Sequence, residues 1–421
     1  MAFAVRCHGN KYLWAIRRAF FRVMPLLLAV SFLDVLESLV LDPWSPIMGE
    51  GGANLGFWLT GGLSGDEYRQ SAWVQSMISA RRIISIGYGM LSMALAMSLA
   101  GNLAGIWGVD RVMAAFCTLA AFLFFLPQTV EIQGEFVDYF AARRFLSAFL
   151  TAFLATWIFS RLSHMERFRI PVPDFLPKDH ARYFMPVLSV ALTLLFLMIL
   201  SVGFEELRAA IQAWVMQIPA GFFQHPVTVA LYQAAVWGLW WFGIPGYGVA
   251  SLVQQAIYVP LDFSNQLGDT ACVFTGGFFE AMAMHVQGLA IAILVFSRHE
   301  SWRGVSRFSL PAALFNIYEP VMFCLPVVLN PLFLIPFLMA PLANVLLGWV
   351  AVSWGIVPIF KAGFSWNMPL LLSGALGTSS FMGGILQVVC LVMDIFIYAP
   401  FVITANMLEF RGEEPEEGEE G

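Results

Sequence analysis

The chain has little charge for its length. Lys, Arg, Asp and Glu make up 12% of its 421 residues, while 59% are hydrophobic and the mean hydropathy is +0.75. Soluble domains carry roughly 25% charged residues, so the composition excludes a soluble globular protein and indicates one embedded in lipid. The length accommodates about ten membrane spans of roughly 20 residues each, with their connections.

Paired cysteines and catalytic motifs are also missing. The five cysteines are scattered through the chain, at Cys7, Cys117, Cys272, Cys324 and Cys390. This spacing favours small buried side chains over disulfides or a metal framework. The sequence holds no glycine-rich phosphate loop with a lysine, no zinc-ligand spacing and no nucleophile beside a base. We therefore expect no metal, no cofactor, no nucleic-acid partner and no enzymatic activity of the chain's own.

Each end of the chain carries charge of one sign only. Residues 412–421 hold six glutamates and no base, which accounts for the whole net charge of −6. The segment 409–421 is predicted to be a disordered acidic tail, or alternatively a linker stub. Five bases stand in residues 1–22, which predicts a cytoplasmic N-terminus. No small-residue cleavage motif follows the first apolar stretch, so that stretch is read as an uncleaved span.

Long apolar stretches divide the rest of the chain. They run near 23–41, 83–106, 111–127, 143–161, 185–204, 227–243, 246–259, 271–296, 342–360 and 383–405. The basic loop from Arg161 to Arg182 follows an even number of crossings, which returns it to the cytoplasm in agreement with the positive-inside rule. Arg81-Arg82 and Arg143-Arg144 then fall near the outer face, against that rule.

Prolines and glycines interrupt the apolar sequence of the second half. Between residues 311 and 341 prolines recur at positions 311, 320, 326, 331, 336 and 341. Broken hydrophobic segments are typical of transport sites built from discontinuous helices. The alternative is that these prolines are ordinary kinks, because Pro and Gly are common in membrane helices.

Glu319 stands in this interrupted stretch with no base beside it. A charge at the centre of a membrane helix costs roughly 2.5–3.5 kcal/mol on insertion scales, so such residues usually face a polar cavity. Pro320 makes an uninterrupted helix interior improbable at this point. A carboxylate has about four acceptor positions and suits vicinal sugar hydroxyls. The alternative is a structural acid bound by backbone amides.

The order of short motifs resembles enzyme IIC, the membrane subunit of the bacterial phosphotransferase system, in its cellobiose, lactose and diacetylchitobiose branch. The densest match is Leu310-Pro311-Ala312-Ala313-Leu314-Phe315-Asn316-Ile317, followed by Glu319-Pro320, Leu325-Pro326, Asn330-Pro331, Ala340-Pro341-Leu342 and Gly355-Ile356-Val357-Pro358. Pro173-Asp174, Gly277-Phe278-Phe279 and Pro400-Phe401 match in the same order, so the similarity covers about 11–408.

The resemblance implies an all-α polytopic membrane protein of about ten transmembrane helices with two re-entrant hairpins, assembled as a homodimer. Residues 23–204 are then the scaffold and dimerisation half, and residues 205–408 the sugar-binding half that slides across the bilayer. Separate IIA and IIB partners phosphorylate the sugar inside. The expected location is the bacterial cytoplasmic (inner) membrane.

Three departures from the family motifs fall in the substrate-binding region. The family's Gly-Ile-His-Gly reads Gly243-Ile244-Pro245-Gly246 here, which removes a sugar-contacting histidine. Its Gly-Gly-Ser-Gly reads His285-Val286-Gln287-Gly288, and a β-branched valine resists the tight turns that glycine allows. Its Asn-Ile-Asn-Glu-Pro has Tyr318 in place of the second asparagine.

Four residues are the candidates for substrate binding. The resemblance carries a sugar-contacting role to Asn316 and Glu319, although Asn316 is equally suited to binding carbonyls freed by the helix break. Tyr318 either stacks on a sugar or fills the vacated space. His285 either replaces the missing histidine or is an ordinary buried histidine with satisfied hydrogen bonds.

Two functions from different classes remain after the sequence is read. The first is a IIC-like permease subunit that binds and translocates a small sugar, a β-linked disaccharide or a relative. The alternative is a transport-inactive membrane sensor or anchor for a regulatory partner, which the three departures favour. An ion-coupled transporter using Asp34 or Glu37, or a proton relay that also involves Asp394, is a weaker third possibility.

Overall fold

The computed structural model describes residues 11–36, 40–41, 47–48, 54–125, 131–132, 135–136, 145–170, 184–244, 246–361 and 368–407. Several sequence expectations lie outside these residues. They concern residues 1–10 of the basic N-terminal segment, the loop 171–183, Pro245 and the acidic tail. They also concern Glu37 and the side chain of Asp34.

Five long helices form the first half. They are α2 (Lys11–Leu36), α5 (Ala72–Trp107), α6 (Arg111–Phe124), α7 (Phe145–Ser163) and α9 (Val187–Met216). The shorter elements are α3 (Leu55–Leu59), α4 (Gly65–Gln70), the 3-10 turn η3 (Glu166–Phe168) and the two-residue strands β1 (Glu131–Ile132) and β2 (Glu135–Phe136), which pair antiparallel. Among the described residues this strand pair is the one regular element that is not helical.

Local sequence sets the turn between α5 and α6. Gly108 ends α5 in the left-handed region, at φ 69°, which glycine adopts without steric cost. Asp110 then accepts a hydrogen bond of 2.7 Å from the N–H of Met113 and caps α6. The turn therefore holds α5 and α6 antiparallel.

The second half is made of shorter and more interrupted elements. They are α10 (Ala220–Phe223), α11 (Pro226–Trp241), α12 (Gly246–Val253), the π-helical segment η4 (Gln254–Tyr258), α13 (Val259–Leu267), α14 (Gly276–Met282), α15 (Val286–Phe296), α16 (Glu300–Leu314), α17 (Glu319–Cys324), α18 (Pro331–Ser353), α19 (Leu372–Gly377) and α20 (Phe381–Met407). The apolar stretch expected over 271–296 is thus two helices, α14 and α15, separated by a break before Val286.

Prolines in the second half divide into two kinds. Pro320 and Pro331 stand in the first turns of α17 and α18, where a missing N–H costs nothing, and they mark true breaks. Pro311, Pro336 and Pro341 lie inside helices that continue through them. The expected interruption of 311–341 is therefore confirmed around α17 but not within α18, where the prolines are ordinary kinks.

Within the described residues, five segments are long and apolar enough to cross a membrane: Met90–Trp107, Val187–Met216, Gly276–Phe296, Pro331–Ser353 and Phe381–Met407. Two shorter apolar helices, Arg111–Phe124 and Ser147–Ser163, lie beside them. The polytopic helical architecture is confirmed, whereas ten crossings and two re-entrant hairpins stay predictions.

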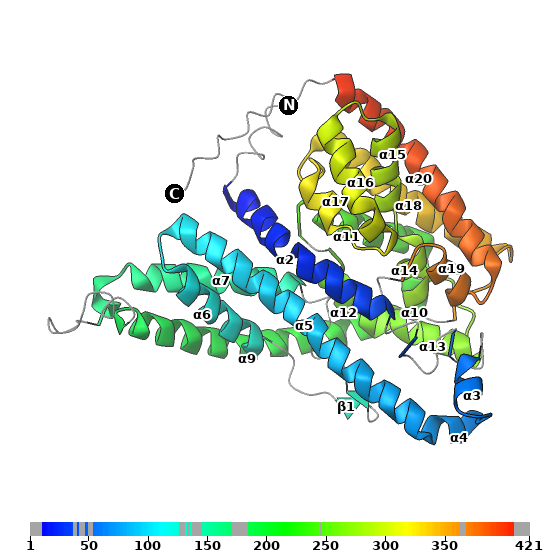
Figure 1. Ribbon diagram of the computed structural model, residues 1–421, viewed down its shortest axis with the longest axis horizontal. Helices are drawn as coiled ribbons and strands as arrows, with labels where there is room; N and C mark the ends of the chain where they lie inside the picture. The colour runs from blue at the N-terminus through cyan, green and yellow to red at the C-terminus, as the bar shows by residue number, and fades with distance from the viewer. Residues whose placement is uncertain are drawn as a thin grey trace.

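The helices gather into two groups that share a core (Figure 1). We call α5, α6, α7 and α9 the scaffold bundle, and α11 with α14–α20 the C-terminal body. Helix α2 runs between them, and its Phe20 stacks on Phe323 of α17 with ring centroids 4.3 Å apart. The domain boundary expected between residues 204 and 205 falls inside the continuous helix α9, so that division stays a prediction.

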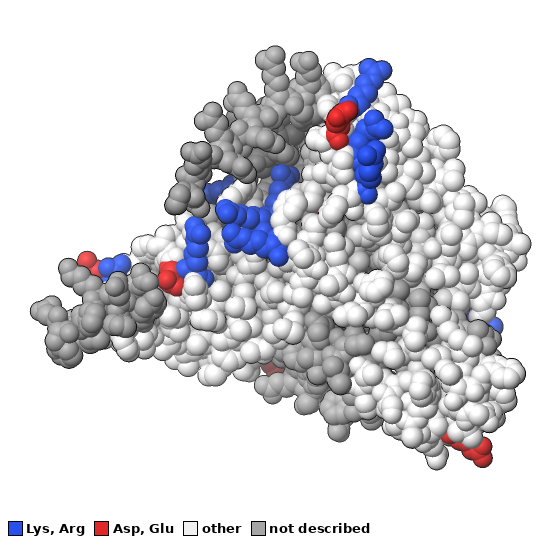
Figure 2. Space-filling view, viewed as in Figure 1, with Lys and Arg blue, Asp and Glu red and all other residues white. Residues whose placement is uncertain are grey.

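Charge is sparse on the face shown in Figure 2, and most of its Lys and Arg lie toward one side. Lys and Arg gather over the start of α2, the α5–α6 turn, the end of α7 and the start of α16, while most of the face is uncharged. A wide uncharged surface beside a basic one is typical of a protein that crosses a bilayer.

Candidate functional site

The four predicted binding residues lie at two helix breaks. Asn316, Tyr318 and Glu319 occupy the turn between α16 and α17, and His285 precedes α15. Asn316 adopts φ 60°, a left-handed conformation that asparagine tolerates better than most residues. Its N–H donates to the carbonyl of Ala313 at 2.9 Å, which closes the turn after α16. The break thus places a carboxylate at the start of a buried helix.

Asn316 links the two breaks. Gln287 Nε2, in the first turn of α15, donates to Asn316 Oδ1 at 2.7 Å. Asn316 Nδ2 donates in turn to the carbonyl of Met368 at 2.9 Å. Both ends of its amide thus contact protein, including one backbone carbonyl, as the structural alternative in the sequence proposed. A sugar contact by Asn316 stays a prediction.

Glu319 is enclosed but not satisfied. Its side chain is 3% exposed. Its Oε2 has no hydrogen-bond partner within the described residues. The alternative of a carboxylate saturated by backbone amides therefore does not describe this oxygen. A buried acceptor left without a partner costs about 1–3 kcal/mol, so Oε2 favours a ligand or water that donates to it.

His285 is half satisfied. The imidazole is fully buried, and its Nδ1 shares a hydrogen bond of 2.7 Å with the hydroxyl of Tyr398 on α20. Its Nε2 has no partner among the described residues. The ring meets Trp237 of α11 edge-on, with centroids 4.2 Å apart, and Phe337 at 4.9 Å. One nitrogen orients the ring while the other is left for a further interaction.

Tyr318 packs among tryptophans. Its ring lies 5.8 Å from that of Trp237 and 5.3 Å from that of Trp240. These separations are ordinary for aromatic packing. The residue fills space beside Glu319, as one of its two sequence interpretations proposed, and contact of this ring with a sugar stays a prediction.

One face of α11 was missed by sequence reasoning as a group. Gln233, Trp237 and Trp240 are buried at spacings that bring them to the same side of the helix. Neither amide atom of Gln233 nor either indole N–H has a hydrogen-bond partner within the described part of the chain. The signal in the sequence was a glutamine at helical spacing from two tryptophans. Because the surrounding sequence is apolar, this pattern is also typical of packing residues.

The face of α11 and the two breaks form one polar cluster. We call Gln233, Trp237, Trp240, His285 and Glu319 the unpartnered cluster. Trp237 contacts both His285 and Tyr318, and Tyr318 also contacts Trp240 and precedes Glu319 in the chain. Acceptors and donors of this variety beside aromatic rings suit a neutral polyhydroxylated ligand.

The glycines that the altered motifs retain have structural roles. Gly243 has φ 79° after α11, and a side chain on Gly246 would collide with the carbonyl of Val236. Both glycines of Gly243-Ile244-Pro245-Gly246 are therefore required by the turn. A side chain on Gly288 would collide with Asp394, so Gly288 permits the close contact of α15 with α20. Val286 begins α15 and has no positive φ, so the tight turn that valine would resist is absent here.

Asp394 lies in a neighbouring polar contact that is only partly satisfied, because its Oδ1 and Asn344 Oδ1 have no partner among the described residues. Its Oδ2 accepts a hydrogen bond of 3.0 Å from Asn344 Nδ2, which also donates to the carbonyl of Met284 at 2.9 Å. The carboxylate is 1% exposed. These contacts join α18, α20 and the segment before α15, and they give Asp394 a role in holding the body together.

Comparisons with known proteins agree on one family. The family model of the phosphotransferase system, EIIC, matches residues 17–341. The oligo-beta-mannoside-specific EIIC component of Bacillus subtilis is 25% identical, over 97% of this chain and 93% of its own length. The cellobiose-specific EIIC component of Lactococcus lactis is 27% identical, over 64% of this chain and 62% of its own length.

A solved structure shows a similar fold. It is the transporter ChbC, the IIC component from the N,N'-diacetylchitobiose-specific phosphotransferase system, matched with a TM-score of 0.50 and 21% identity. The match covers 95% of this chain and 94% of that one. At this identity the likeness concerns the fold alone.

Proposed function

The chain belongs to the phosphotransferase system EIIC family, and on that premise we propose that it binds a small β-linked sugar in its C-terminal body and carries it across the bacterial membrane. EIIC components are integral membrane transport subunits, and separate IIA and IIB components carry out the phosphorylation. The relatives are named for β-linked oligosaccharides, which supports the substrate class.

The observation that carries the proposal is the unpartnered cluster. Glu319 Oε2 is the acceptor for sugar hydroxyls, because a carboxylate forms the stronger, charge-assisted hydrogen bonds. Gln233 offers a donor and an acceptor, and the indole N–H of Trp240 offers a donor. The rings of Trp240 and Tyr318 supply the apolar surface against which a sugar face packs.

His285 is proposed to replace the histidine lost at Pro245. Its ring contacts Trp237, which is on the helix that leads into the Gly243-Ile244-Pro245-Gly246 turn. Tyr398 fixes the ring through Nδ1, and Nε2 is left without a partner within the described residues. This arrangement supports a sugar contact from the neighbouring hairpin.

The two groups of helices suggest how the molecule moves. We infer that the C-terminal body slides against α2 and the scaffold bundle in a homodimer, with the N-terminus in the cytoplasm. Helix α17 supports this, because it carries Glu319 at one end and meets α2 at the other through Phe323 and Phe20. The one-sided distribution of Lys and Arg supports the orientation (Figure 2).

The test uses the purified chain in vesicles and a panel of β-linked disaccharides that begins with cellobiose. Wild type is expected to bind at least one sugar saturably and to exchange labelled for unlabelled sugar across the membrane. Glu319→Gln is expected to bind at least about tenfold more weakly, because a charged acceptor is lost. Glu300→Gln, at an exposed position on α16, is the matched control and keeps wild-type affinity.

The transport-inactive sensor is kept as the second candidate, because a hydrogen-bonding histidine is absent at Pro245. Binding without exchange favours the sensor. No binding across the panel removes the sugar site, and unchanged affinity in Glu319→Gln removes Glu319 from it.

A further inference from the structure

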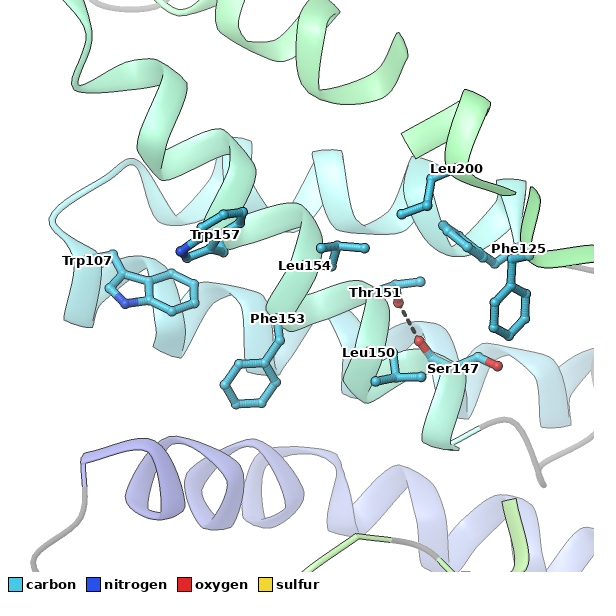
Figure 3. A pocket seen from close by; sticks show the side chains of 10 residues that line it. Trp107, Phe125, Ser147, Leu150, Thr151, Phe153, Leu154, Trp157 and Leu200 are labelled. Carbon is cyan, nitrogen blue, oxygen red and sulfur yellow. Dashed lines mark hydrogen bonds between the residues drawn. The ribbon is translucent and has the colours of Figure 1, made fainter. Parts of the chain in front are cut away.

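The scaffold bundle contains an apolar groove. The residues that line it are remote in sequence from the unpartnered cluster, and almost all of them are apolar. The volume of the groove is about 480 Å³, and Trp107, Phe125, Trp157 and Phe204 are among the residues that line it. Figure 3 shows both tryptophans at one end and Phe125 at the other, with Leu150, Thr151 and Leu154 of α7 between them. The groove therefore follows the axis of α7.

The groove offers no free hydrogen-bonding group from Thr151, its most central polar residue. The Thr151 hydroxyl donates to the carbonyl of Ser147 at 2.7 Å (Figure 3). It also lies 3.2 Å from the carbonyl of Ala148. The remaining lining is aliphatic and aromatic apart from Ser147. A sugar finds few hydrogen-bonding groups there, whereas the apolar lining matches a hydrocarbon chain.

The length of the groove fits one leaflet of a bilayer. From Ser147 to Trp157 the lining covers ten residue steps of α7, which at 1.5 Å per residue is about 15 Å. Half of a hydrocarbon core roughly 30 Å thick has the same extent. Trp157 and Leu150 are 48% and 52% exposed, so the groove opens toward the lipid side of the bundle.

Four arginines gather at the tryptophan end. The Arg161 guanidinium lies over the Trp157 ring, 5.8 Å from its centroid, and Arg111 packs against Gly105 two residues before Trp107. Arg169 Nε donates to the carbonyl of Ser163 at the end of α7, at 3.2 Å, and Arg167 stands two residues before it in the chain. Within the described residues none of the four forms an ion pair, and all are exposed.

Packing places these arginines together. Ala104 near the end of α5, Ala114 near the start of α6 and Phe159 near the end of α7 share one buried cluster. The end of α5, the start of α6 and the end of α7 therefore meet at one face of the bundle. A groove with an apolar body and a basic mouth is complementary to an amphiphile with a negative head.

We propose that the groove binds an acyl chain of an anionic glycerophospholipid whose phosphate lies against Arg161 and Arg111. A second copy of the chain is the other possible occupant. In a two-fold dimer about the membrane normal, however, that copy brings its own four arginines to the same side of the membrane, where like charges repel. The anionic lipid supplies the opposite charge.

The test measures lipid retained by the full chain after mild detergent extraction from vesicles of equimolar phosphatidylglycerol and phosphatidylcholine. Native mass spectrometry counts each lipid on the protein and reports its oligomeric state. Wild type is expected to retain phosphatidylglycerol in excess, by about fivefold for each contributing arginine. The double variant Arg111→Gln, Arg161→Gln is expected to lose this preference.

Two further variants separate the head from the groove. Arg303→Gln, Arg307→Gln alters two exposed arginines of α16 and is expected to keep the wild-type preference. Leu154→Trp fills the groove and is expected to reduce retention of both lipids. The proposal is overturned if both double variants lose the preference equally, or if wild type retains the two lipids alike. It is also overturned if the dimer carries no lipid while the monomer does, because a second copy then occupies the groove.

Discussion

The scaffold bundle and the C-terminal body differ in how many of their buried polar groups have hydrogen-bond partners. In the scaffold, Thr118 and Thr156 lie within hydrogen-bond distance of each other, at 3.5 Å, and Thr193 donates to the carbonyl of Ser189 at 2.7 Å. In the body, two carboxylates, an imidazole, two indoles and two amides each leave at least one polar atom without a partner among the described residues. Where the structure describes it, the scaffold contains single hydroxyls of that kind, such as that of Ser92, and no such cluster of varied groups.

The difference supports the proposal that the body, and not the scaffold, binds a polar ligand. A buried polar atom without a partner costs about 1–3 kcal/mol, so several of them together are a sustained loss of stability. Continuous helices fill the scaffold, whereas short helices broken at Asn316 and His285 bring the unpartnered groups together in the body. The comparison supports our proposal that the body binds the sugar and the scaffold supports it.

The largest expected effect comes from closing the α15–α20 contact. Gly288→Val places a side chain against Asp394 and is expected to destabilise the body by about 3 kcal/mol through overpacking, with loss of sugar binding. Thermal unfolding in detergent measures it. Gly203→Val in α9, where no atom lies within 4 Å of the added carbon, is the scaffold control. Equal destabilisation of the two variants contradicts the contact described here.

Removal of the unpartnered nitrogen of His285 is expected to have the next largest effect, which is on sugar affinity. His285→Ala is expected to weaken sugar binding about tenfold, since one buried hydrogen bond is lost. His285→Gln keeps a polar group near the ring position and is expected to recover part of the affinity. Isothermal titration with the best-bound sugar measures both. If His285→Ala binds as wild type does, His285 is a structural residue held by Tyr398.

Exchanging a single indole distinguishes the two halves more finely. Trp240→Phe keeps most of the aromatic surface but removes the N–H, and about a fivefold loss of sugar affinity is expected. Trp157→Phe makes the same exchange in the scaffold groove and is expected to leave affinity unchanged. Competition binding with a labelled sugar resolves this difference, and a larger loss in Trp157→Phe reverses the assignment of the two halves.

The smallest effect is expected where polar groups satisfy each other. Thr118→Val, Thr156→Val replaces both partners by apolar side chains of similar shape, which is nearly neutral for stability. The unfolding temperature and the sugar affinity are both expected to stay close to wild type. A marked fall in affinity shows that the scaffold pair is coupled to the site.

Sequence reasoning located the break at Glu319 because asparagine and proline have strong local preferences. Asn316 takes the left-handed conformation and Pro320 stands in the first turn of α17. Residues close together in the chain therefore determine this turn. For Pro336 and Pro341 the same reasoning left two alternatives, a break or an ordinary position within a helix, and the structure agrees with the second. Helix α18 continues through both, since surrounding helices compensate for a missing N–H inside a membrane protein.

Contacts between distant residues were beyond sequence reasoning. His285 and Tyr398 are 113 positions apart, and only the fold shows that one imidazole nitrogen is bound and the other is not. The face of α11 was hidden for a similar reason. Gln233 and Trp240 stand in apolar sequence that suits packing equally well, and their unpartnered atoms depend on which elements surround them.

The most direct test pairs Glu319→Gln with sugars that lack one hydroxyl each. If the Glu319 carboxylate accepts a hydrogen bond from a sugar, one deoxy sugar binds wild type about tenfold more weakly than the parent, yet binds Glu319→Gln nearly as well as the parent does. This coupling identifies the hydroxyl and the acceptor together. Equal losses in wild type and Glu319→Gln for every deoxy sugar contradict a sugar site at Glu319.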